Sequence, residues 1–258
     1  VKERPEIAEA FIAAAGQAGY PRTPDYNGET QDGFGYYQVN QRHGRRVSAA
    51  DAYLAPARGR PNLRVLTGAH VLRVDLDGAR ATGVTYRVDG VERQAIARNS
   101  VVLTAGAIQT PHLLELSGIG DPAVLAAAGL PLRHQLPGVG ANYSDHFCTR
   151  MNWRVKLPVT LNVRTRPDIE GPDIQYFFMH ASYANAAERR LDRQPGMTIG
   201  VTQLRPDSRG TIHARAPDFD IAPAIRPNFL ATTADRQCMV DGMKIAREIV
   251  GQPAMDAY

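Results

Sequence analysis

The stretch that decides the fold is GAIQTPHLLELSGIG, which runs from Gly106 to Gly120. Just before it, Val101–Leu103 is apolar on both faces, as expected of a buried strand. Two small residues, Ala105 and Gly106, then lead into a helical pattern. Small side chains let a ligand or another backbone come close, and ligands of open α/β sheets lie beyond the carboxyl ends of strands. The order of elements predicts a close-approach point at Ala105 and Gly106, with tight strand–helix packing as the alternative.

The helix after this point carries its own start and stop residues. Thr110 suits the N-cap and Pro111 the first helical position, while Ser117-Gly118 suits the end. A further short helix is expected over 122–128, ended by Gly129. Leu136–His146, LPGVGANYSDH, is then predicted to be a compact loop that contains glycine.

On the N-terminal side the hydrophobic period is two, which predicts strands. Asp77-Gly78 and Asp89-Gly90 are tight-turn pairs, so the later strands are expected to form an antiparallel meander. The predicted strands are Leu63–Thr67, His70–Leu76, Ala81–Val88 and Val91–Arg98.

The outer parts of the chain add helices and a second set of strands. Helices are expected at 5–18, at 48–54 with Ser48 as N-cap, and at Ala234–Val250. Strands are expected at Tyr36–Gln41, Thr149–Leu157, Asp173–His180, Met197–Leu204 and Gly210–Arg215. The fold class that follows is α+β (mixed α/β), with a change of domain near residue 147.

Composition excludes several classes of function. With 43% hydrophobic and 22% charged residues, the 258-residue chain has the balance of a soluble globular protein. No apolar run reaches the about 20 residues of a transmembrane helix, so no transmembrane segment is expected. Its arginines are scattered among acidic residues, which argues against a nucleic-acid partner. Two cysteines outside any CxxC pair, and histidines without i, i+4 spacing, give no metal site.

The pattern of Gly106–Gly120, G-A-x-x-T-P-x-L-L-x-x-S-G-I-G, resembles a characteristic motif of the glucose–methanol–choline (GMC) oxidoreductases. Other segments resemble the same family in the same order along the chain. They are Gly33–Gly35 with the residues up to Leu54, Arg60–Val71, Leu136–His146, Pro206–Ile212 and Ile225–Leu230. The stretch Asp32–Leu54 is most similar to the choline and primary-alcohol dehydrogenase branch.

The resemblance implies a partial GMC fold. Residues 1–35 would be a substrate or lid-type segment, and 36–146 the C-terminal part of an FAD-binding domain with the antiparallel meander. Residues 147–258 would be part of a substrate-binding domain built on an antiparallel sheet. Because the chain begins at Val1 and contains no strand–GxGxxG–helix unit, we expect an internal fragment, truncated at both ends.

The resemblance also implies a cofactor, FAD, and candidate cofactor-binding residues. These are Val71, which would act through its backbone, Ala105, Gly106, Asn142, Asp145 and His146. For the last three, capping of their own loop is the alternative. Tyr176, Phe177 and Phe178 are candidates for the wall of a substrate pocket, although strand alternation places at least half of them in the core. No histidine here matches the family's catalytic motif, so no catalytic residue is assigned.

The implied activity is that of an FAD-dependent oxidoreductase acting on the CH–OH group of a small alcohol. Hydride would pass to the flavin N5, and the electron acceptor stays unassigned. A noncatalytic remnant or binding module is one alternative, and a flavin-bearing enzyme of the hydroxynitrile lyase type is another. We expect a cytoplasmic protein, with association at a membrane surface as the alternative. The isolated chain is expected to bind FAD poorly and to be inactive.

Overall fold

The computed structural model describes residues 6–154, 161–163, 172–179, 181–185, 188, 190–193 and 196–258. The chain divides into two compact units. Unit 1 contains 1–46, 145–208 and 229–258, and unit 2 contains 47–144 and 209–228. The sequence-based division differs in placing 36–46 and 145–146 with the second segment and 209–228 with the third. The functional roles of its three segments stay predictions.

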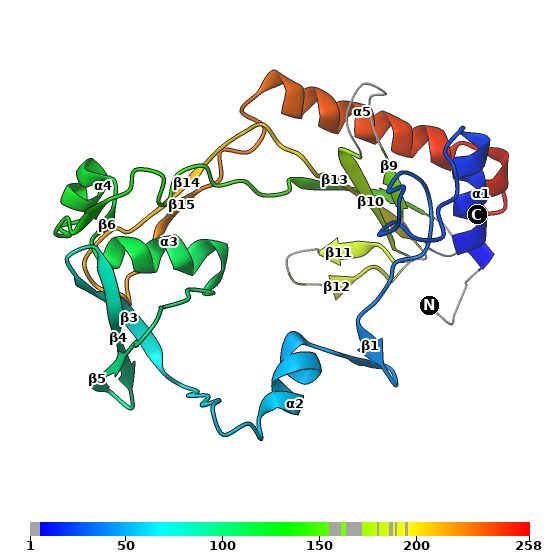
Figure 1. Ribbon diagram of the computed structural model, residues 1–258. Coiled ribbons are helices and arrows are strands. Elements are labelled where there is room, and N and C mark those ends of the chain that lie inside the picture. Colours follow the sequence, from blue (N-terminus) through cyan, green and yellow to red (C-terminus); the bar gives the residue numbers. More distant parts are fainter. Residues whose placement is uncertain are drawn as a thin grey trace. The chain divides into compact units, whose positions relative to one another are not determined.

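Unit 1 is a four-stranded antiparallel sheet with two helices on one face (Figure 1). Its strand order is β8-β13-β10-β9, where β8 is Cys148–Trp153, β13 Met197–Gln203, β10 Ile174–Met179 and β9 Leu161–Val163. The helices are α1, Glu6–Gln17, and α5, Thr233–Val250. They form because apolar residues recur at helical spacing, and Thr232 caps α5 by accepting a hydrogen bond from the Asp235 N–H. Both helices and all three of the larger strands lie where the sequence predicts them.

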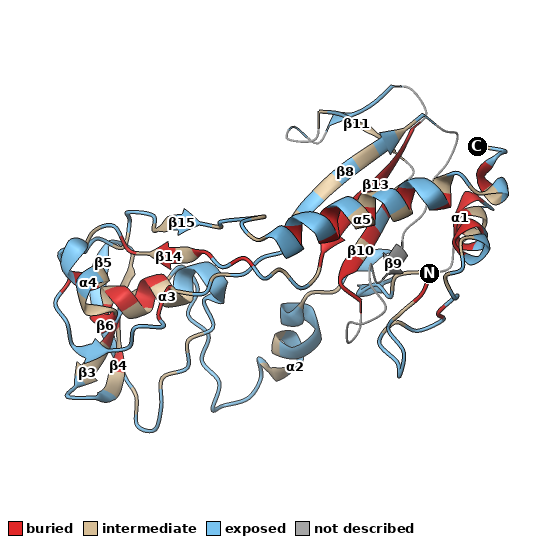
Figure 2. Cartoon of the chain, turned by 90° about the horizontal axis from the view of Figure 1, so that it is seen from above, coloured by how far each residue is buried: buried red, intermediate tan, exposed pale blue. Residues whose placement is uncertain are grey.

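The core of unit 1 lies between this sheet and the helices. Along β10, Ile174, Tyr176 and Phe178 are buried and alternate with more exposed residues, so one face of the strand packs on the helices. The central strand β13 is buried along its whole length (Figure 2). Tyr176 and Phe178 are therefore core residues, whereas Phe177 lies on the opposite face and is 40% exposed.

A buried carboxylate joins α5 to the connection after β13. Asp235 is 1% exposed. Its Oδ1 accepts hydrogen bonds from Gln203 Nε2 (2.7 Å) and the Asp207 N–H (2.8 Å), and its Oδ2 accepts from the N–H and hydroxyl of Ser208. Burial raises the pKa of Asp235, but these hydrogen bonds to the charged form outweigh it and lower the pKa to about 2.

Unit 2 contains the three-stranded meander of β3 (His70–Asp77), β4 (Arg80–Val88) and β5 (Val91–Ile96), as predicted. The β4–β5 turn holds Asp89 and Gly90 at φ values of 51° and 76°, the positive values that a type I′ turn requires. Beside it lie α3 (Gly106–Leu116) and α4 (Pro122–Ala127). Two small pairs complete the unit: β6 (Ile119–Gly120) is parallel to β7 (His134–Gln135), and β14 (Thr211–His213) is antiparallel to β15 (Ala224–Arg226).

The remaining elements are short. They are β1 (Gln41–Arg42), β2 (Arg45–Arg46), a π-helix at Ala50–Leu54, α2 (Ala55–Ala57), β11 (Tyr183–Asn185), β12 (Arg190–Leu191) and a 3₁₀ helix at Pro253–Met255. The Ser48 hydroxyl accepts a hydrogen bond from the Asp51 N–H, as expected for a capping residue. Among the described residues, no helix is both long and apolar enough to cross a membrane.

Three of the predicted strands are wrong. Leu63–Thr67 and Val101–Leu103 form no strand, and of Tyr36–Gln41 only Gln41 lies in one. A strand needs hydrogen bonds from a neighbour, and among the described residues no strand pairs with 36–40, 63–67 or 101–103. The prediction that Val101–Leu103 is buried fails for the same reason, since Val102 is 77% exposed.

The bounds of other elements also differ from the prediction. The helix α3 begins at Gly106 rather than at Pro111, which lies inside it. In the region of Gly210–Arg215 only Thr211–His213 is a strand. Residues 155–157 and His180, the predicted ends of two strands, lie outside the described residues.

We predict that Asp235→Asn lowers the free energy of unfolding by about 2 kcal/mol at pH 7, the value of a pKa held almost two units below its unfolded value. Because the folded pKa is depressed, the wild-type chain has this stability above about pH 4 and loses it as the pH falls toward 2. Urea unfolding at pH 7, 4 and 2 measures it. The exposed Asp256→Asn is the control, and equal pH dependence in the wild-type chain and Asp235→Asn contradicts the prediction.

Candidate functional site

The start of α3 is an uncapped helix N-terminus beside open space. Ala105, the N-cap residue, makes no side-chain cap hydrogen bond. Gly106 has φ +84°, and no heavy atom lies within 4 Å of the Cβ that a larger residue would carry. Glycine is therefore required here by the backbone conformation, not by crowding. The first N–H groups of α3 and the positive end of its dipole are thus available to a polar group.

A hollow of about 560 Å³ adjoins this helix start. Its lining is mainly apolar and combines the meander with the segment that leads into α3. The lining residues are Val71, Gly83, Val84, Ala95, Ile96, Ala97, Ser100, Val101, Val102, Leu103, Thr104, Ala105 and Leu113. Two of the predicted cofactor-binding residues, Val71 and Ala105, therefore line the same hollow. A third, Gly106, directly follows Ala105 in the chain.

Val71 lies on an irregular edge strand. The pairing of β3 with β4 shifts between Val71 and Arg73, which leaves Leu72 opposite no residue. Because β3 pairs only with β4 among the described strands, some of its backbone groups point away from the sheet. A backbone contact from Val71, as predicted from the sequence, is compatible with this position.

A second hollow also adjoins the first turns of α3. Its volume is about 330 Å³, and it is lined by Ala107, Pro111, the loop 140–144 and Ile212. The predicted residue Asn142 is part of this loop and has φ +59°. Asn142 thus lies near the start of the same helix as Ala105 and Gly106.

The loop with Asn142 is fixed by backbone hydrogen bonds to β14 and the residue before it. Gly140 O accepts a hydrogen bond from the Ile212 N–H (2.7 Å), and Tyr143 exchanges two hydrogen bonds with Gly210 (2.9 and 2.8 Å). A Cβ at Gly140 would collide with Ile212 O, and the φ of Gly140 is +70°. Both the contact and the conformation require glycine here.

Asp145 and His146 line neither of these two hollows. They belong to unit 1, whereas the α3 start belongs to unit 2. The Asp145 carboxylate accepts a hydrogen bond from the His146 N–H at 2.8 Å. The cofactor role of all six residues stays a prediction. Within unit 2, Val71 and Ala105 line one hollow, Gly106 follows Ala105 in the chain, and Asn142 lines the second hollow.

Sequence reasoning missed the residues that fix α3. Glu115 is fully buried. Its carboxylate contacts His213 Nδ1 at 2.7 Å and accepts a hydrogen bond from the Ala214 N–H at 2.5 Å. The signal in the sequence was one acidic residue inside the apolar run Leu113–Leu116, because a buried charge must have partners.

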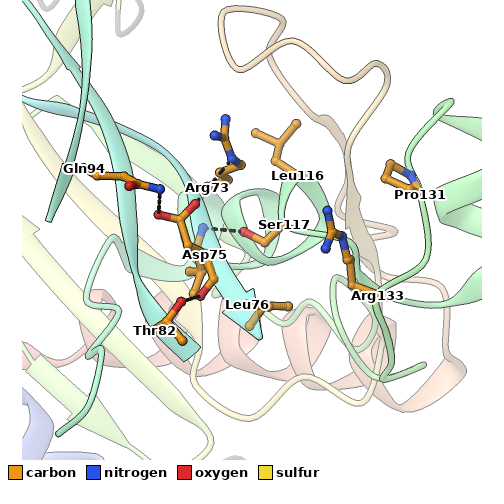
Figure 3. A pocket seen from close by; sticks show the side chains of 10 residues that line it. Arg73, Asp75, Leu76, Thr82, Gln94, Leu116, Ser117, Pro131 and Arg133 are labelled. Atoms are coloured by element: carbon orange, nitrogen blue, oxygen red, sulfur yellow. Dashed lines mark hydrogen bonds and ion pairs between the residues drawn. The ribbon is translucent and has the colours of Figure 1, made fainter. Parts of the chain in front are cut away.

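Ser117 fixes the same end of α3 to the meander. Its hydroxyl accepts a hydrogen bond from the Val74 N–H at 2.8 Å and donates one to Leu113 O at 2.6 Å. Around it lies a polar hollow of about 430 Å³ that also contains Arg73, Asp75 and Arg133 (Figure 3). The sequence predicted Ser117 only as the end of the helix.

The carboxylate in this polar hollow is already satisfied by the protein. Asp75 accepts hydrogen bonds from Thr85 Oγ1 (2.8 Å) and Gln94 Nε2 (3.3 Å) and pairs with Arg73 Nε at 3.5 Å. Among the described residues there is no group of three or more His, Cys, Asp or Glu side chains able to hold a metal ion. The hollow at the α3 start is therefore the stronger candidate for a functional site.

We predict that Gly140→Ala destabilises the chain by at least about 2 kcal/mol, because the new Cβ meets Ile212 O and the left-handed conformation is unfavourable for alanine. Thermal unfolding followed by circular dichroism measures the loss. Gly138→Ala is the matched control, since a Cβ there meets no atom within 4 Å. Equal melting temperatures for the two variants would show that the Gly140 contact does not constrain the loop.

Comparison with known proteins identifies relatives over the whole chain. A family model described as GMC oxidoreductase matches residues 1–148, and a second with the same description matches 206–257. Two curated relatives are oxygen-dependent choline dehydrogenases, one from Pseudomonas putida and one from Photobacterium profundum. They are 36% and 35% identical, over 98% of this chain and 51% and 50% of their own length. The chain thus spans about half the length of the curated relatives it matches.

Solved structures agree with this. Pyridoxine 4-oxidase from Mesorbium loti superposes with a TM-score of 0.85 and 26% identity, over all of this chain and 53% of that one. Formate oxidase from Aspergillus oryzae has a TM-score of 0.81 at 20% identity, over 99% of this chain and 55% of that one, which is a likeness of fold alone. The structural neighbours support the partial GMC fold expected from the sequence.

Proposed function

We propose that this chain forms the part of an FAD-dependent oxidoreductase that flanks the cofactor and the substrate. The chain belongs to the GMC oxidoreductase family. The enzyme would act on the CH–OH group of a small alcohol. The observation that carries the proposal is the hollow at the start of α3, which joins Val71 to Ala105. GMC oxidoreductases use FAD, so a cofactor surface is expected in this part of the chain.

The residues at this hollow fit a part of such a cofactor. An apolar lining suits a planar ring system, and the uncapped N–H groups of α3 suit its polar or anionic edge. Ala105 and Gly106 allow close approach because their side chains are small, and the space beside Gly106 is open. Val71 would contribute backbone groups of an edge strand. When bound, FAD supplies the hydride acceptor for alcohol oxidation.

No residue of this chain is assigned as the base that would accept the proton of the alcohol hydroxyl. His112, in the second turn of α3, is a buried histidine, and burial lowers its pKa, which favours the neutral ring. Its Nδ1 lies 3.1 Å from Gln109 Oε1, and its ring stacks on Phe219. Because the ring is fully buried and lines neither hollow beside α3, we assign His112 no role in the reaction. We infer that the isolated chain does not oxidise alcohols and binds FAD weakly.

The proposal is tested by titrating the ¹⁵N-labelled chain with FAD and following amide NMR shifts. We expect shifts around residues 71 and 100–106. Ala105→Leu should weaken binding about tenfold, or about 1.4 kcal/mol, because the larger side chain enters the hollow. Ala126→Leu, at an exposed site on α4, is the control.

Two results would contradict this proposal. One is a set of shifts that avoids the hollow or is absent at millimolar FAD. The other, which counts against the expected weak binding and inactivity, is purification of the chain with stoichiometric flavin that an alcohol bleaches.

A further inference from the structure

One face of the unit 1 sheet packs on the core, and the other face points away from the core. The strand register determines on which face each residue lies. Phe178, Ile199 and Met151 lie opposite one another on β10, β13 and β8, and all three belong to the core with α1 and α5. The neighbouring row, Phe177, Gly200 and Arg150, therefore points to the other face. This second face is defined here as the open face. Its residues Arg150 and Phe177, on the two flanking strands, are exposed, whereas its residues on β13 are buried.

The sheet, as far as the structure describes it, carries a single charged residue. The sequences of its four strands are CTRMNW, LNV, IQYFFM and MTIGVTQ, which contain no Asp, Glu or Lys and one Arg. That arginine is Arg150, which the register places on the open face. Any small molecule that meets this face therefore meets one positive charge from the strands and no negative one.

Arg150 has unused hydrogen-bonding capacity. Its guanidinium lies over the ring of Tyr183, 5.9 Å from the ring centre. Within the described residues, the guanidinium has neither a hydrogen bond nor an ion pair. Its planar N–H groups match the two oxygens of a carboxylate.

The other end of the row is an aromatic surface. Phe177 is 40% exposed and stacks on Tyr37, with ring centres 5.7 Å apart and planes at 24°. The Tyr37 hydroxyl donates a hydrogen bond to Tyr176 O at 3.1 Å, which fixes the ring. Burial, and then the neighbouring Tyr26, raise the pKa of Tyr37, so its hydroxyl stays neutral at physiological pH and adds no negative charge.

The spacing of the two groups suits one small molecule. Arg150 and Phe177 lie on strands separated only by β13, so their backbones are roughly 10 Å apart. Gly200, between them, is buried, and it has no side chain to separate them. A benzene ring with a carboxylate at one end spans a comparable length.

We propose that the open face recognises an alcohol that carries a carboxylate and an aromatic or other apolar body, and that it disfavours a quaternary ammonium alcohol such as choline. This inference rests on the proposed function and on the expectation that residues 147–258 belong to a substrate-binding domain. Arg150 binds the carboxylate, and the Phe177–Tyr37 pair packs on the body. A cationic substrate would meet the Arg150 charge, which no acidic residue of the four strands offsets.

The test compares three probes of similar size but different charge on the same chain: 4-(hydroxymethyl)benzoate, benzyl alcohol and choline. Binding is measured by calorimetry and by the fluorescence of Trp153, the only tryptophan, which lies on β8. We expect 4-(hydroxymethyl)benzoate to bind at least tenfold more tightly than choline. Arg150→Gln should remove most of this preference while leaving benzyl alcohol unchanged.

Further variants separate recognition from folding. Arg150→Lys should retain part of the preference, since the charge stays but the planar fork is lost. Phe177→Leu should weaken both aromatic probes alike. Arg42→Gln, at an exposed arginine on β1 of the same unit, should change nothing.

The inference is overturned if choline binds as tightly as the carboxylate, if Arg150→Gln leaves the preference intact, or if the folded chain binds no carboxylate. Its failure is distinguishable from failure of the proposed function, because the FAD titration reports on residues of unit 2. Arg150-dependent binding without FAD shifts at Val71 and Ala105 would sink the proposed function alone. The reverse pattern would sink the substrate class alone.

Discussion

The buried carboxylate of Glu115 is the constraint on which unit 2 depends. A charge with no exposure is tolerated only when hydrogen bonds replace the lost water, and here His213 and the Ala214 N–H supply them. These partners lie about a hundred residues later in the chain, so the contact fixes β14 against α3. With Ser117 tied to Val74 at the same end, the helix is held by its C-terminal half. Its N-terminal half is thereby left available beside the two hollows.

A buried carboxylate also fixes the scaffold of unit 1. Asp235 accepts four hydrogen bonds from Gln203, Asp207 and Ser208, and it joins the first turn of α5 to the end of the central strand. The helix then covers one face of the sheet with apolar side chains, and the other face carries Arg150 and Phe177. In both units a buried acid fixes the scaffold, and the residues with proposed functions lie away from it. A variant of either acid would therefore act on stability before it acts on binding.

The elements that the sequence predicted correctly are those specified locally. Asp77-Gly78 and Asp89-Gly90 dictate tight turns whatever the rest of the chain does, and the meander follows from them. The helices α1 and α5 follow from apolar periodicity. The segment Val101–Leu103 has the pattern of a buried strand, but a strand is defined by its neighbour, and pattern alone does not supply one. The error at Pro111 is similar, because a motif of start residues cannot show that Gly106 already begins the helix.

The residues of the candidate site also divide into those that the local sequence indicates and those that depend on packing. The motif identified Ala105 and Gly106 because small residues before a helix are a local feature. That Ala105 and Val71 line one hollow depends on the packing of the meander, which the sequence left open. Asn142 comes near α3 through hydrogen bonds of Gly140 and Tyr143 to the segment 210–212, far along the chain. Glu115 stood out in the sequence as an acidic residue in an apolar run, but its partners His213 and Ala214 are visible only in the fold. Arg150 was missed because its place on the sheet depends on the strand register.

Arg150 shows why membership of a family does not settle a substrate. The relatives share the scaffold and the flavin, and the flavin carries out the redox chemistry whichever alcohol is bound. Choice among alcohols is a difference in binding free energy, and one charge near the substrate changes that difference for anions and cations in opposite directions. The net charge of +4 does not reveal a preference for anionic or cationic alcohols, since it is a sum over the whole chain. The charge of Arg150 does indicate such a preference, because the four strands of the sheet contain no other charged residue.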